Sequence, residues 1–324
     1  MYTGNMQIRN LNFSSPFFLA PLAGYSDAPF RRIAREWGAS CAVSEMVSAE
    51  GLARGSDKTE DLLRRYDGED QFIIQIFAPS LDPVGRCLDR LLRYRPTMID
   101  INCGCPVAKV VKTGAGSAMM RNPDEINRIV SFLTENTDVP VSVKFRLGWD
   151  SSSINYIEFA DACYDGGASM LTLHARTRSQ LYSGSADWSH IKHLKDHFRD
   201  KDVAIFASGD IFCGADAVEV MKISGCDGVM FARGAIGNPF IFRQAAEAVK
   251  GNDFSPTLEE KTETLLTHLS YMISWYGSET ACRDMRKHAV GYVKGIKGAS
   301  RAKQLINTAS SYEDYRRAMD ELKE

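Results

Sequence analysis

The sequence predicts an α/β protein in which a (β/α)8 TIM barrel is followed by a small helical domain. Short apolar runs recur eight times within roughly 240 residues, and a segment with helical periodicity follows each run. After about residue 245 the strand pattern stops and only helical patterns remain. Eight such units in this length are typical of a barrel with one appended domain.

The apolar runs have the character of buried parallel strands. They are rich in β-branched and other apolar residues on both faces, as strands covered by helices are. The runs cover residues 17–21, 41–47, 71–77, 98–102, 139–146, 169–176, 203–210 and 227–234. Each run ends in polar or glycine-containing residues, as barrel strands do where the following loops build an active site. A doubly wound open sheet is the competing architecture, and these strand ends favour the barrel.

The helical segments carry start signals and apolar faces. Asn122 is a candidate N-cap, and Pro123 follows it at the first helical position. Residues 251–257 have the composition of a linker. Beyond this linker, apolar side chains recur on one helical face, namely Leu265, Leu266, Leu269, Met272, Ile273 and Tyr276. We therefore expect a barrel over residues 1–245 and a helical domain over residues 246–324.

Composition and charge exclude several classes of protein. The 324 residues have a formal net charge of -2, so a polyanionic partner must meet a local basic patch and not a global field. Such a patch lies between Ala281 and Gln304, where seven Lys or Arg residues accompany one acid, Asp284. No stretch approaches the roughly 20 apolar residues that a membrane span needs. Eight scattered cysteines without a CxxC motif predict thiols and not a disulfide framework, so we expect a cytoplasmic protein without a membrane partner.

The ends of the predicted strands present polar side chains that we expect to converge on one pocket. These are Gln75, Asn102, Lys144, Arg146, His174 and Arg176. Gly209 and Gly234, at the last two strand ends, allow backbone amides to approach a phosphate closely, and Arg233 adds a bidentate charge. Each residue also has a purely structural alternative as a cap, a turn or an ion-pair partner. Their joint placement at one end of the barrel favours a site.

Cys103 and Cys105, in the stretch "DINCGCP" at residues 100–106, lie at the end of the fourth run. The spacing of two residues disfavours a disulfide, and a metal ion would need further ligands that no nearby His or Cys supplies. An ordinary thiol, with a pKa near ~8.5, is still protonated at pH 7. Acid chemistry is therefore compatible with this pair of thiols.

Seven ordered blocks of the chain resemble the signature blocks of the tRNA-dihydrouridine synthases, most closely those of the bacterial B-type branch. The blocks are "PLAGYSDAPFR" (21–31), "DINCGCP" (100–106), "KTGAGSAMM" (112–120), "VKFRLGWD" (143–150), "LHARTRSQLYSGSADW" (173–188), "ASGDI" (207–211) and "ARGAIGNPFIF" (232–242). The segment "MRKHAVGYVKGIKGASRAK" (285–303) of the helical tail adds to the likeness. The resemblance covers nearly the whole chain.

The resemblance implies an enzyme with bound FMN that uses NADPH to reduce the C5–C6 double bond of uridines in tRNA. It implies that Cys105 is the catalytic acid, whereas Cys103 is interpreted as a packing thiol, and it implies no metal. The implied flavin-binding residues are Pro21, Leu22, Ala23, Gln75, Lys144, His174, Ser208, Gly209, Asp210, Ala232 and Arg233. "SGD" stands where Asn-Gly-Asp is usual, and "HAR" stands where His-Gly-Arg is usual, which leaves the role of Ser208 open.

We expect tRNA to contact the basic patch and the mouth of the barrel. The predicted contacts are Asn102, Lys109, Arg146, Arg176, Arg178, Arg283, Arg286, Lys287 and Lys294. No obligate protein partner is inferred. One alternative is an FMN-dependent TIM-barrel reductase or dehydrogenase of a free pyrimidine or another small molecule, which has no need of a basic tail. A second alternative is a non-catalytic RNA-binding scaffold, which has no need of Cys105, Lys144, His174 and Arg233.

Overall fold

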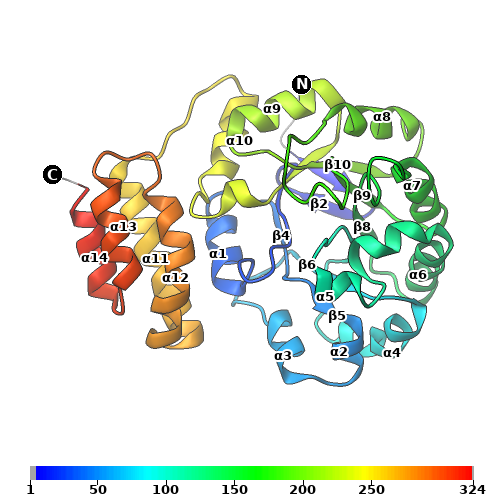
Figure 1. Ribbon diagram of the computed structural model, residues 1–324, viewed down its shortest axis with the longest axis horizontal. Helices are drawn as coiled ribbons and strands as arrows, with labels where there is room; N and C mark the ends of the chain where they lie inside the picture. Colours follow the sequence, from blue (N-terminus) through cyan, green and yellow to red (C-terminus); the bar gives the residue numbers. More distant parts are fainter. Residues whose placement is uncertain (1–4, 323–324) are drawn as a thin grey trace.

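The computed structural model describes residues 5–322. At its centre lies a closed barrel of parallel strands, which Figure 1 shows on the right. The strands are β3 (Phe17–Leu19), β4 (Cys41–Val43), β6 (Phe72–Phe77), β7 (Met98–Cys103), β8 (Val141–Arg146), β9 (Met170–His174), β10 (Ala204–Ser208) and β11 (Gly228–Phe231). Each pairs with the next in chain order, and β11 returns to β3. The predicted (β/α)8 barrel is therefore confirmed, and an open sheet is excluded.

Helices surround the barrel and bury the outer faces of its strands. They are α1 (Ala28–Glu36), α4 (Leu81–Leu92), α6 (Pro123–Asn136), α7 (Tyr156–Asp165), α8 (Ser189–His197), α9 (Gly214–Ser224) and α10 (Ile241–Val249). The predicted start of α6 is confirmed, because the side chain of Asn122 accepts a hydrogen bond from the backbone N–H of Glu125 and Pro123 occupies the first turn.

Short elements lie in the connections between the strands and these helices. They are β5 (Val47–Ser48), α2 (Ala49–Ala53), α3 (Asp57–Glu60), η1 (Asp61–Leu63), α5 (Ala108–Val111), η2 (Gly116–Arg121) and η3 (Arg233–Ala235). Three of them, α5, η2 and η3, follow the carboxyl ends of β7 and β11. They therefore shape the mouth of the barrel.

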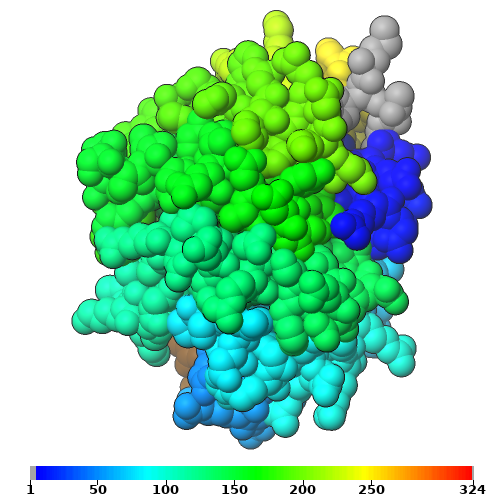
Figure 2. Space-filling view, turned by 90° about the vertical axis from the view of Figure 1, so that its right-hand side faces the viewer, coloured from blue at the N-terminus to red at the C-terminus, as the bar shows by residue number. Residues whose placement is uncertain are grey.

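The sequence patterns did not predict an N-terminal hairpin of β1 (Met6–Ile8) and β2 (Leu11–Phe13). Its strands are too short to show an apolar period. Ile8 and Phe13 are buried, and the ring of Phe13 lies 4.7 Å from the ring of Phe18 at the amino-terminal end of the barrel. Figure 2 shows the hairpin in dark blue at the right-hand edge of the molecule. The hairpin closes the end of the barrel opposite the strand ends that carry the predicted site.

A bundle of four helices follows the barrel and lies beside α1 in Figure 1. The helices are α11 (Leu258–Tyr276), α12 (Ser278–Tyr292), α13 (Ala299–Thr308) and α14 (Tyr312–Asp320). Leu265, Leu269 and Met272, on the predicted face of α11, are buried in a core of the bundle's own. None of the described helices has the length and apolar character needed to cross a membrane.

The expected boundary between residues 245 and 246 falls inside α10. The buried side chains Ile241, Phe242 and Ala245 of this helix belong to the core of the barrel. The two cores are joined by residues 250–257, between the end of α10 and the start of α11. The linker predicted at residues 251–257 coincides with this connection.

The bundle docks on α1 and on the loop that precedes it. The ring of Phe30 lies 4.9 Å from His288 and 5.6 Å from His268, and both histidines are fully buried. The hydroxyl of Tyr276 donates to Asp27 at 3.1 Å, and that of Tyr271 donates to Glu36 at 2.9 Å. Because the loop before α1 also carries Pro21 to Ala23, this docking places the bundle beside the mouth of the barrel.

Candidate active site

A cavity of about 650 Å³ opens at the carboxyl ends of the barrel strands. Every residue that was predicted for catalysis or cofactor binding lines it: Pro21, Leu22, Ala23, Gln75, Cys105, Lys144, His174, Ser208, Gly209, Asp210, Ala232 and Arg233. Asn102 and Arg146 line it as well. The structure thus brings together side chains from seven of the eight strand ends, while their individual roles stay predictions.

Cys105 lies in a loop that is held on both sides. Its backbone N–H donates to Oδ1 of Asn102 at 2.9 Å, and its carbonyl accepts bonds from the backbone N–H and the hydroxyl of Ser117, both at 3.0 Å. Gly116 is required at its position, because a Cβ there would lie 2.7 Å from the same carbonyl oxygen. Burial raises the pKa of the Cys105 thiol, so this thiol stays protonated at neutral pH.

Cys103 has a different environment from Cys105. Successive residues of a strand face opposite sides of the sheet, so Cys103, the last residue of β7, faces away from the side of Asn102, whereas Cys105 lies in the loop beyond the strand. Cys103 is fully buried in the main core of the barrel, whereas Cys105 is partly exposed and lines the cavity. The placement of Cys103 agrees with its interpretation as a packing thiol.

The loops after β10 and β11 each carry a glycine that close protein packing requires. A Cβ on Gly209 would lie 2.8 Å from Cδ2 of His174, and a Cβ on Gly234 would lie 2.4 Å from the carbonyl oxygen of Ile211. Arg233 lies between them and donates to Asp210 at 3.0 Å. This donor set, with one guanidinium beside two glycine backbones, is typical of a phosphate site.

The cavity carries positive charge in a partly dry environment. Burial, together with the charge of Arg146, lowers the pKa of Lys144 to about 8, and burial lowers the pKa of Arg146 to about 10. Burial and the neighbouring cations lower the pKa of His174 well below its usual value, so its imidazole is neutral. Nε2 of His174 is buried and has no hydrogen-bond partner among residues 5–322. The cavity therefore suits an anionic ligand that also accepts or donates a hydrogen bond at His174.

Arg176 is placed differently from its predicted role in tRNA contact. Only 1 % of its surface is exposed, and its guanidinium donates to Asp210, to the carbonyl of Ser183 and to the carbonyl of Gly184. A guanidinium whose donors are already engaged inside the protein cannot reach an RNA phosphate. In this structure Arg176 anchors Asp210, and its contact with tRNA stays a prediction that this placement disfavours.

Arg146 and Arg286 also make internal hydrogen bonds. Arg146 is buried and donates to the carbonyls of Gly104, Thr177 and Leu181, although it still lines the cavity. Arg286 is partly exposed and donates twice to the carbonyl of Ala309. Arg146 is thus placed for a ligand inside the cavity and not for a phosphate on the surface.

The other predicted tRNA contacts lie outside the cavity. Lys109, Arg283, Lys287 and Lys294 are exposed, and Arg178 is partly exposed. The ammonium group of Lys287 lies 5.1 Å from the ring of Tyr25, and Tyr25 lines the cavity. The basic face of α12 therefore borders the mouth of the barrel directly.

Among the residues in or under the cavity that were not singled out from the sequence, Tyr182, Phe212 and Asp100 stand out. Tyr182 and Phe212 line the cavity and are 53 % and 49 % exposed, and the guanidinium of Arg233 stacks on both rings at 4.3 and 5.4 Å. Asp100 lies beneath the cavity and is fully buried. A charged residue inside an apolar strand run was a signal that could have identified Asp100. The two aromatic rings lie in loops, where no periodic pattern marks them.

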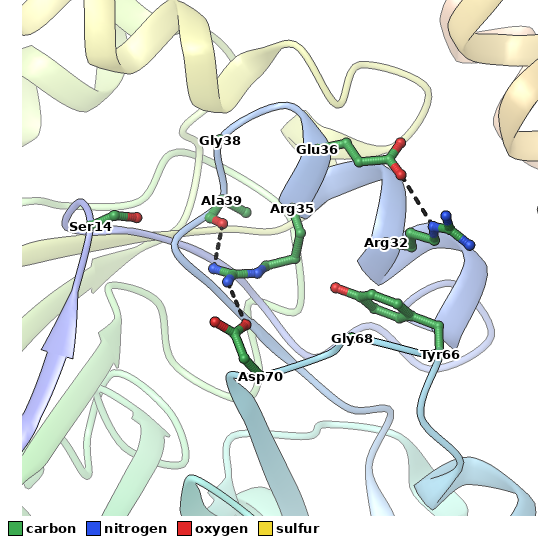
Figure 3. Close-up of a pocket in the computed structure, with 9 residues that line it drawn as sticks. All are labelled: Ser14, Arg32, Arg35, Glu36, Gly38, Ala39, Tyr66, Gly68 and Asp70. Carbon is green, nitrogen blue, oxygen red and sulfur yellow. Dashed lines mark hydrogen bonds and ion pairs between the residues drawn. The ribbon is translucent and has the colours of Figure 1, made fainter.

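A second cavity, of about 450 Å³, lies between α1 and residues 66–70 (Figure 3). Its cations are already compensated: Arg35 pairs with Asp70 at 2.8 Å, and Arg32 pairs with Glu36 at 3.1 Å. Within residues 5–322, no group of three or more His, Cys, Asp or Glu side chains is placed to hold a metal ion. The barrel mouth is therefore the stronger candidate site.

Known proteins resemble this chain along nearly its whole length. Residues 18–324 match the family model described as dihydrouridine synthase (Dus). A probable tRNA-dihydrouridine synthase of Treponema pallidum is 39% identical over 96% of this chain and 94% of its own length. The tRNA-dihydrouridine synthase B of Pasteurella multocida is 33% identical over 93% and 91%. The chain belongs to the dihydrouridine synthase family.

Proposed function

We propose that this protein is a tRNA-dihydrouridine synthase that binds FMN, takes electrons from NADPH and reduces the C5–C6 double bond of a uridine in the D-loop of tRNA. The observation that carries the proposal is the arrangement of one cavity. Cys105, whose thiol burial keeps protonated, lines this cavity, and so do Arg233, Gly209 and Gly234, which would bind an anion.

The residues of the cavity fit FMN. Arg233 and the backbone around Gly209 and Gly234 would hold its single phosphate, with Ser208, Asp210 and Ala232 beside them. The free Nε2 of His174 would donate or accept a bond at the ribityl chain or phosphate. Pro21, Leu22, Ala23, Gln75 and Lys144 would border its ring. When bound, FMN would supply the hydride that adds to C6 of uracil, having received it from NADPH.

Cys105 supplies the proton in this proposal. Addition of a hydride at C6 leaves negative charge at C5 and the neighbouring carbonyl, which a proton at C5 neutralises. The thiol of Cys105 gives up its S–H proton to C5 and becomes a thiolate, which regains a proton from solvent. Burial favours this role, because it raises the pKa of the thiol and keeps it protonated until the charge develops.

The exposed basic residues account for tRNA as the substrate. Lys287 and Lys294 on the side of the bundle, with Arg283, and Lys109 and Arg178 at the barrel rim would neutralise phosphates. Arg146 and Asn102 lie inside the cavity, where they would meet the uracil that has left its stack. A base in a single-stranded loop leaves its stack at lower cost than a base in a duplex. A tRNA substrate implies a cytoplasmic location.

The rival proposal is a flavin reductase of a free pyrimidine or another small molecule. The cavity alone would serve either function. The basic face of α12, which borders the cavity through Lys287 and Tyr25, favours the tRNA substrate because a small molecule makes no use of it.

The experiment that tests the proposal uses the purified protein with NADPH and an unmodified tRNA transcript. Acid release should yield FMN, and nucleosides from the treated tRNA should include uridine that has gained two mass units. Reduction of free uridine at the same rate as uridine in tRNA would favour the rival. Absence of both products with a flavin-loaded protein would reject the proposal.

A further inference from the structure

Strand β7 carries two polar residues, Asp100 and Asn102, that face the interior of the barrel. Asp100 is fully buried and Asn102 is 8 % exposed. In the parallel register Asp100 lies opposite Gln75 on β6 and opposite Ser142 on β8, and both of these are fully buried. Four polar side chains therefore lie side by side in the barrel interior, where a buried polar group is costly unless it is hydrogen-bonded.

These side chains form one continuous chain of hydrogen bonds that ends at the Cys105 loop. The carboxylate of Asp100 accepts from Oγ of Ser142 and from Nε2 of Gln75, both at 2.6 Å. Oε1 of Gln75 accepts from Nδ2 of Asn102 at 2.7 Å. Oδ1 of Asn102 accepts from the backbone N–H groups of Gly104 at 3.2 Å and Cys105 at 2.9 Å.

The donors and acceptors in this series of hydrogen bonds can be arranged in only one direction. Backbone N–H groups donate only, so Asn102 must turn its oxygen toward the loop and its NH2 toward Gln75. Gln75 must then turn its oxygen toward Asn102 and its NH2 toward residue 100. Residue 100 must then accept from Gln75, as a carboxyl oxygen can. Burial raises the pKa of Asp100, and the hydrogen bonds from Ser142 and Gln75 oppose that shift. The orientations of both amides thus depend on Asp100.

We propose that Asp100 is a positioning residue, which fixes the orientations of Gln75 and Asn102 and thereby holds the loop that carries the Cys105 thiol. Asp100 does not line the cavity, so it acts through the two amides and not by contact with a ligand. The inference deepens the proposed function, because it names the device that places the proton donor.

A different role for Asp100 is a counter-charge for Lys144, whose charge interacts with it. Asp100→Asn separates the two roles. The asparagine oxygen can still accept from Gln75, and its NH2 can donate to Ser142, so the direction of the chain is kept while the charge is lost. Asp100→Leu removes both the charge and the acceptor.

The test measures how fast iodoacetamide alkylates Cys105 in the flavin-free protein, with each cysteine followed by mass spectrometry. Cys213 is exposed and serves as the internal reference, whereas Cys103 and Cys163 are fully buried and report on folding, because they stay unlabelled in a folded protein. Thr172→Val is the matched control: its hydroxyl is buried inside the barrel without a hydrogen-bond partner in the described part of the chain.

We expect Asp100→Leu to accelerate the labelling of Cys105 by about tenfold relative to Cys213, as loss of one hydrogen bond from the loop allows. Asp100→Asn and Thr172→Val should label within about twofold of the unchanged protein. If Asp100→Asn labels as fast as Asp100→Leu, the counter-charge role is correct and the positioning role is rejected. If Asp100→Leu is folded and labels at the unchanged rate, the positioning role is also rejected.

A double variant tests the direction of the chain without reference to Asp100→Leu. Asn102→Asp should accelerate labelling, because two carboxylates then compete for the single NH2 of Gln75. Adding Asp100→Asn reverses the whole chain: the carboxylate introduced at position 102 accepts from the loop and from Gln75, and the new amide at position 100 donates to Gln75 and accepts from Ser142. Labelling should return to within about twofold of the unchanged protein. A double variant that labels as fast as Asn102→Asp alone would overturn the proposal.

The labelling assay needs neither flavin nor tRNA, so its outcome is independent of the proposed activity. A protein that reduces no tRNA but shows the rescue would reject the proposed function and leave the positioning role of Asp100 intact. A protein that reduces tRNA but shows no rescue would support the proposed function and reject the positioning role of Asp100.

Discussion

The guanidinium of Arg176 holds both carboxylate oxygens of Asp210, with Nη1 at 2.8 Å from Oδ1 and Nη2 bonded to Oδ2. Asp210 in turn accepts from the backbone N–H of Ala186 at 2.8 Å and from Arg233 at 3.0 Å. The buried arginine therefore orients the carboxylate that orients Arg233 at the cavity. The packing of Arg176 and the position of Arg233 in the cavity are therefore linked through Asp210.

Arg176→Met should lower both stability and flavin retention. Asp210 keeps Arg233 and the N–H of Ala186 as partners and is partly exposed, so the loss of unfolding free energy should be smaller than the roughly 3 kcal/mol that breaking a fully buried pair costs. Urea unfolding of the flavin-free protein measures the first effect, and the flavin-to-protein ratio after gel filtration measures the second. A fall in stability with unchanged flavin retention would show that Asp210 does not hold Arg233 in its functional position.

The same pair predicts a dependence on pH. Burial opposes ionisation of Asp210, but the hydrogen bonds and charges of Arg176 and Arg233 outweigh it and lower the pKa of Asp210 below its usual 3.8. The stabilisation is therefore complete above pH 3.8 and is lost as the pH falls through the lower folded value. The difference in unfolding free energy between the unchanged protein and Asp210→Asn should be constant at neutral pH and shrink in acid. A difference that persists undiminished at a pH of about 2 would contradict this assignment.

Arg233→Ala should weaken FMN binding by about tenfold to a hundredfold, as loss of a charged hydrogen bond of about 1.5–3 kcal/mol implies. Fluorescence titration of the flavin-free variant with FMN gives the Kd. Riboflavin, which lacks the phosphate, is the matched ligand and should bind both proteins alike. An equal loss of riboflavin binding would place the phosphate away from Arg233.

Cys105→Ala should bind FMN, accept hydride from NADPH and bind tRNA, yet fail to form dihydrouridine. A general acid commonly contributes ~10²–10⁴-fold in rate, so the defect should be large and confined to the tRNA half-reaction. Cys103→Ala removes a small buried group and should cost about 1 kcal/mol of stability with little effect on rate. Single-turnover oxidation of the reduced flavin by tRNA compares the two variants, and a slow Cys103→Ala beside a fast Cys105→Ala would reverse the assignment.

Charge reversal on the bundle should affect tRNA alone. Lys287→Glu with Lys294→Glu should raise the KM for tRNA and flatten its salt dependence, because fewer phosphates are neutralised, while NADPH oxidation stays unchanged. These positions test the surface better than Arg286, whose guanidinium also holds the carbonyl of Ala309. Lys222→Glu with Lys201→Glu, at two exposed positions of the barrel, is the matched control, because it changes the net charge by the same amount. An equal rise in the KM for tRNA with this control would show that the effect comes from the net charge of the protein and not from Lys287 and Lys294.

The histidine pair between barrel and bundle predicts a loss of stability in mild acid. Burial lowers the pKa of both His268 and His288, and the ring nitrogens of His288 have no hydrogen-bond partner among the described residues. The unfolded chain binds protons below a pH of about 6.5 and the folded chain does not, so stability falls by about 1.4 kcal/mol per pH unit for each histidine. His174 is also buried with a lowered pKa, so His288→Leu should remove about a third of the slope that these three histidines contribute between pH values of about 6.5 and 5. If the slope of the unfolding free energy against pH, measured by urea unfolding, is unchanged, then His288 takes up its proton in the folded protein as readily as in the unfolded chain.

Periodic patterns made much of this molecule predictable. The eight apolar runs matched the eight barrel strands because a parallel strand buried on both faces needs an unbroken apolar run, which a single chain displays locally. The polar strand ends from Gln75 to Arg233 were correctly expected to meet, because all parallel strands of a barrel end at the same rim. The Asn122 cap and the linker at 251–257 were local signals of the same kind.

Tertiary structure alone decided which distant side chains pair. The hairpin of β1 and β2 was not predicted because it packs in a cluster with side chains such as Phe206 and Met230, which lie far along the chain. Arg176 had the pattern of a surface cation until its partner, 34 residues away, was in place. Tyr276 meets Asp27 across 249 residues, and the direction of the amides of Gln75 and Asn102 depends on three neighbouring strands. A local pattern encodes period and burial, whereas the choice of a hydrogen-bond partner depends on which side chains packing brings within about 3 Å of each other.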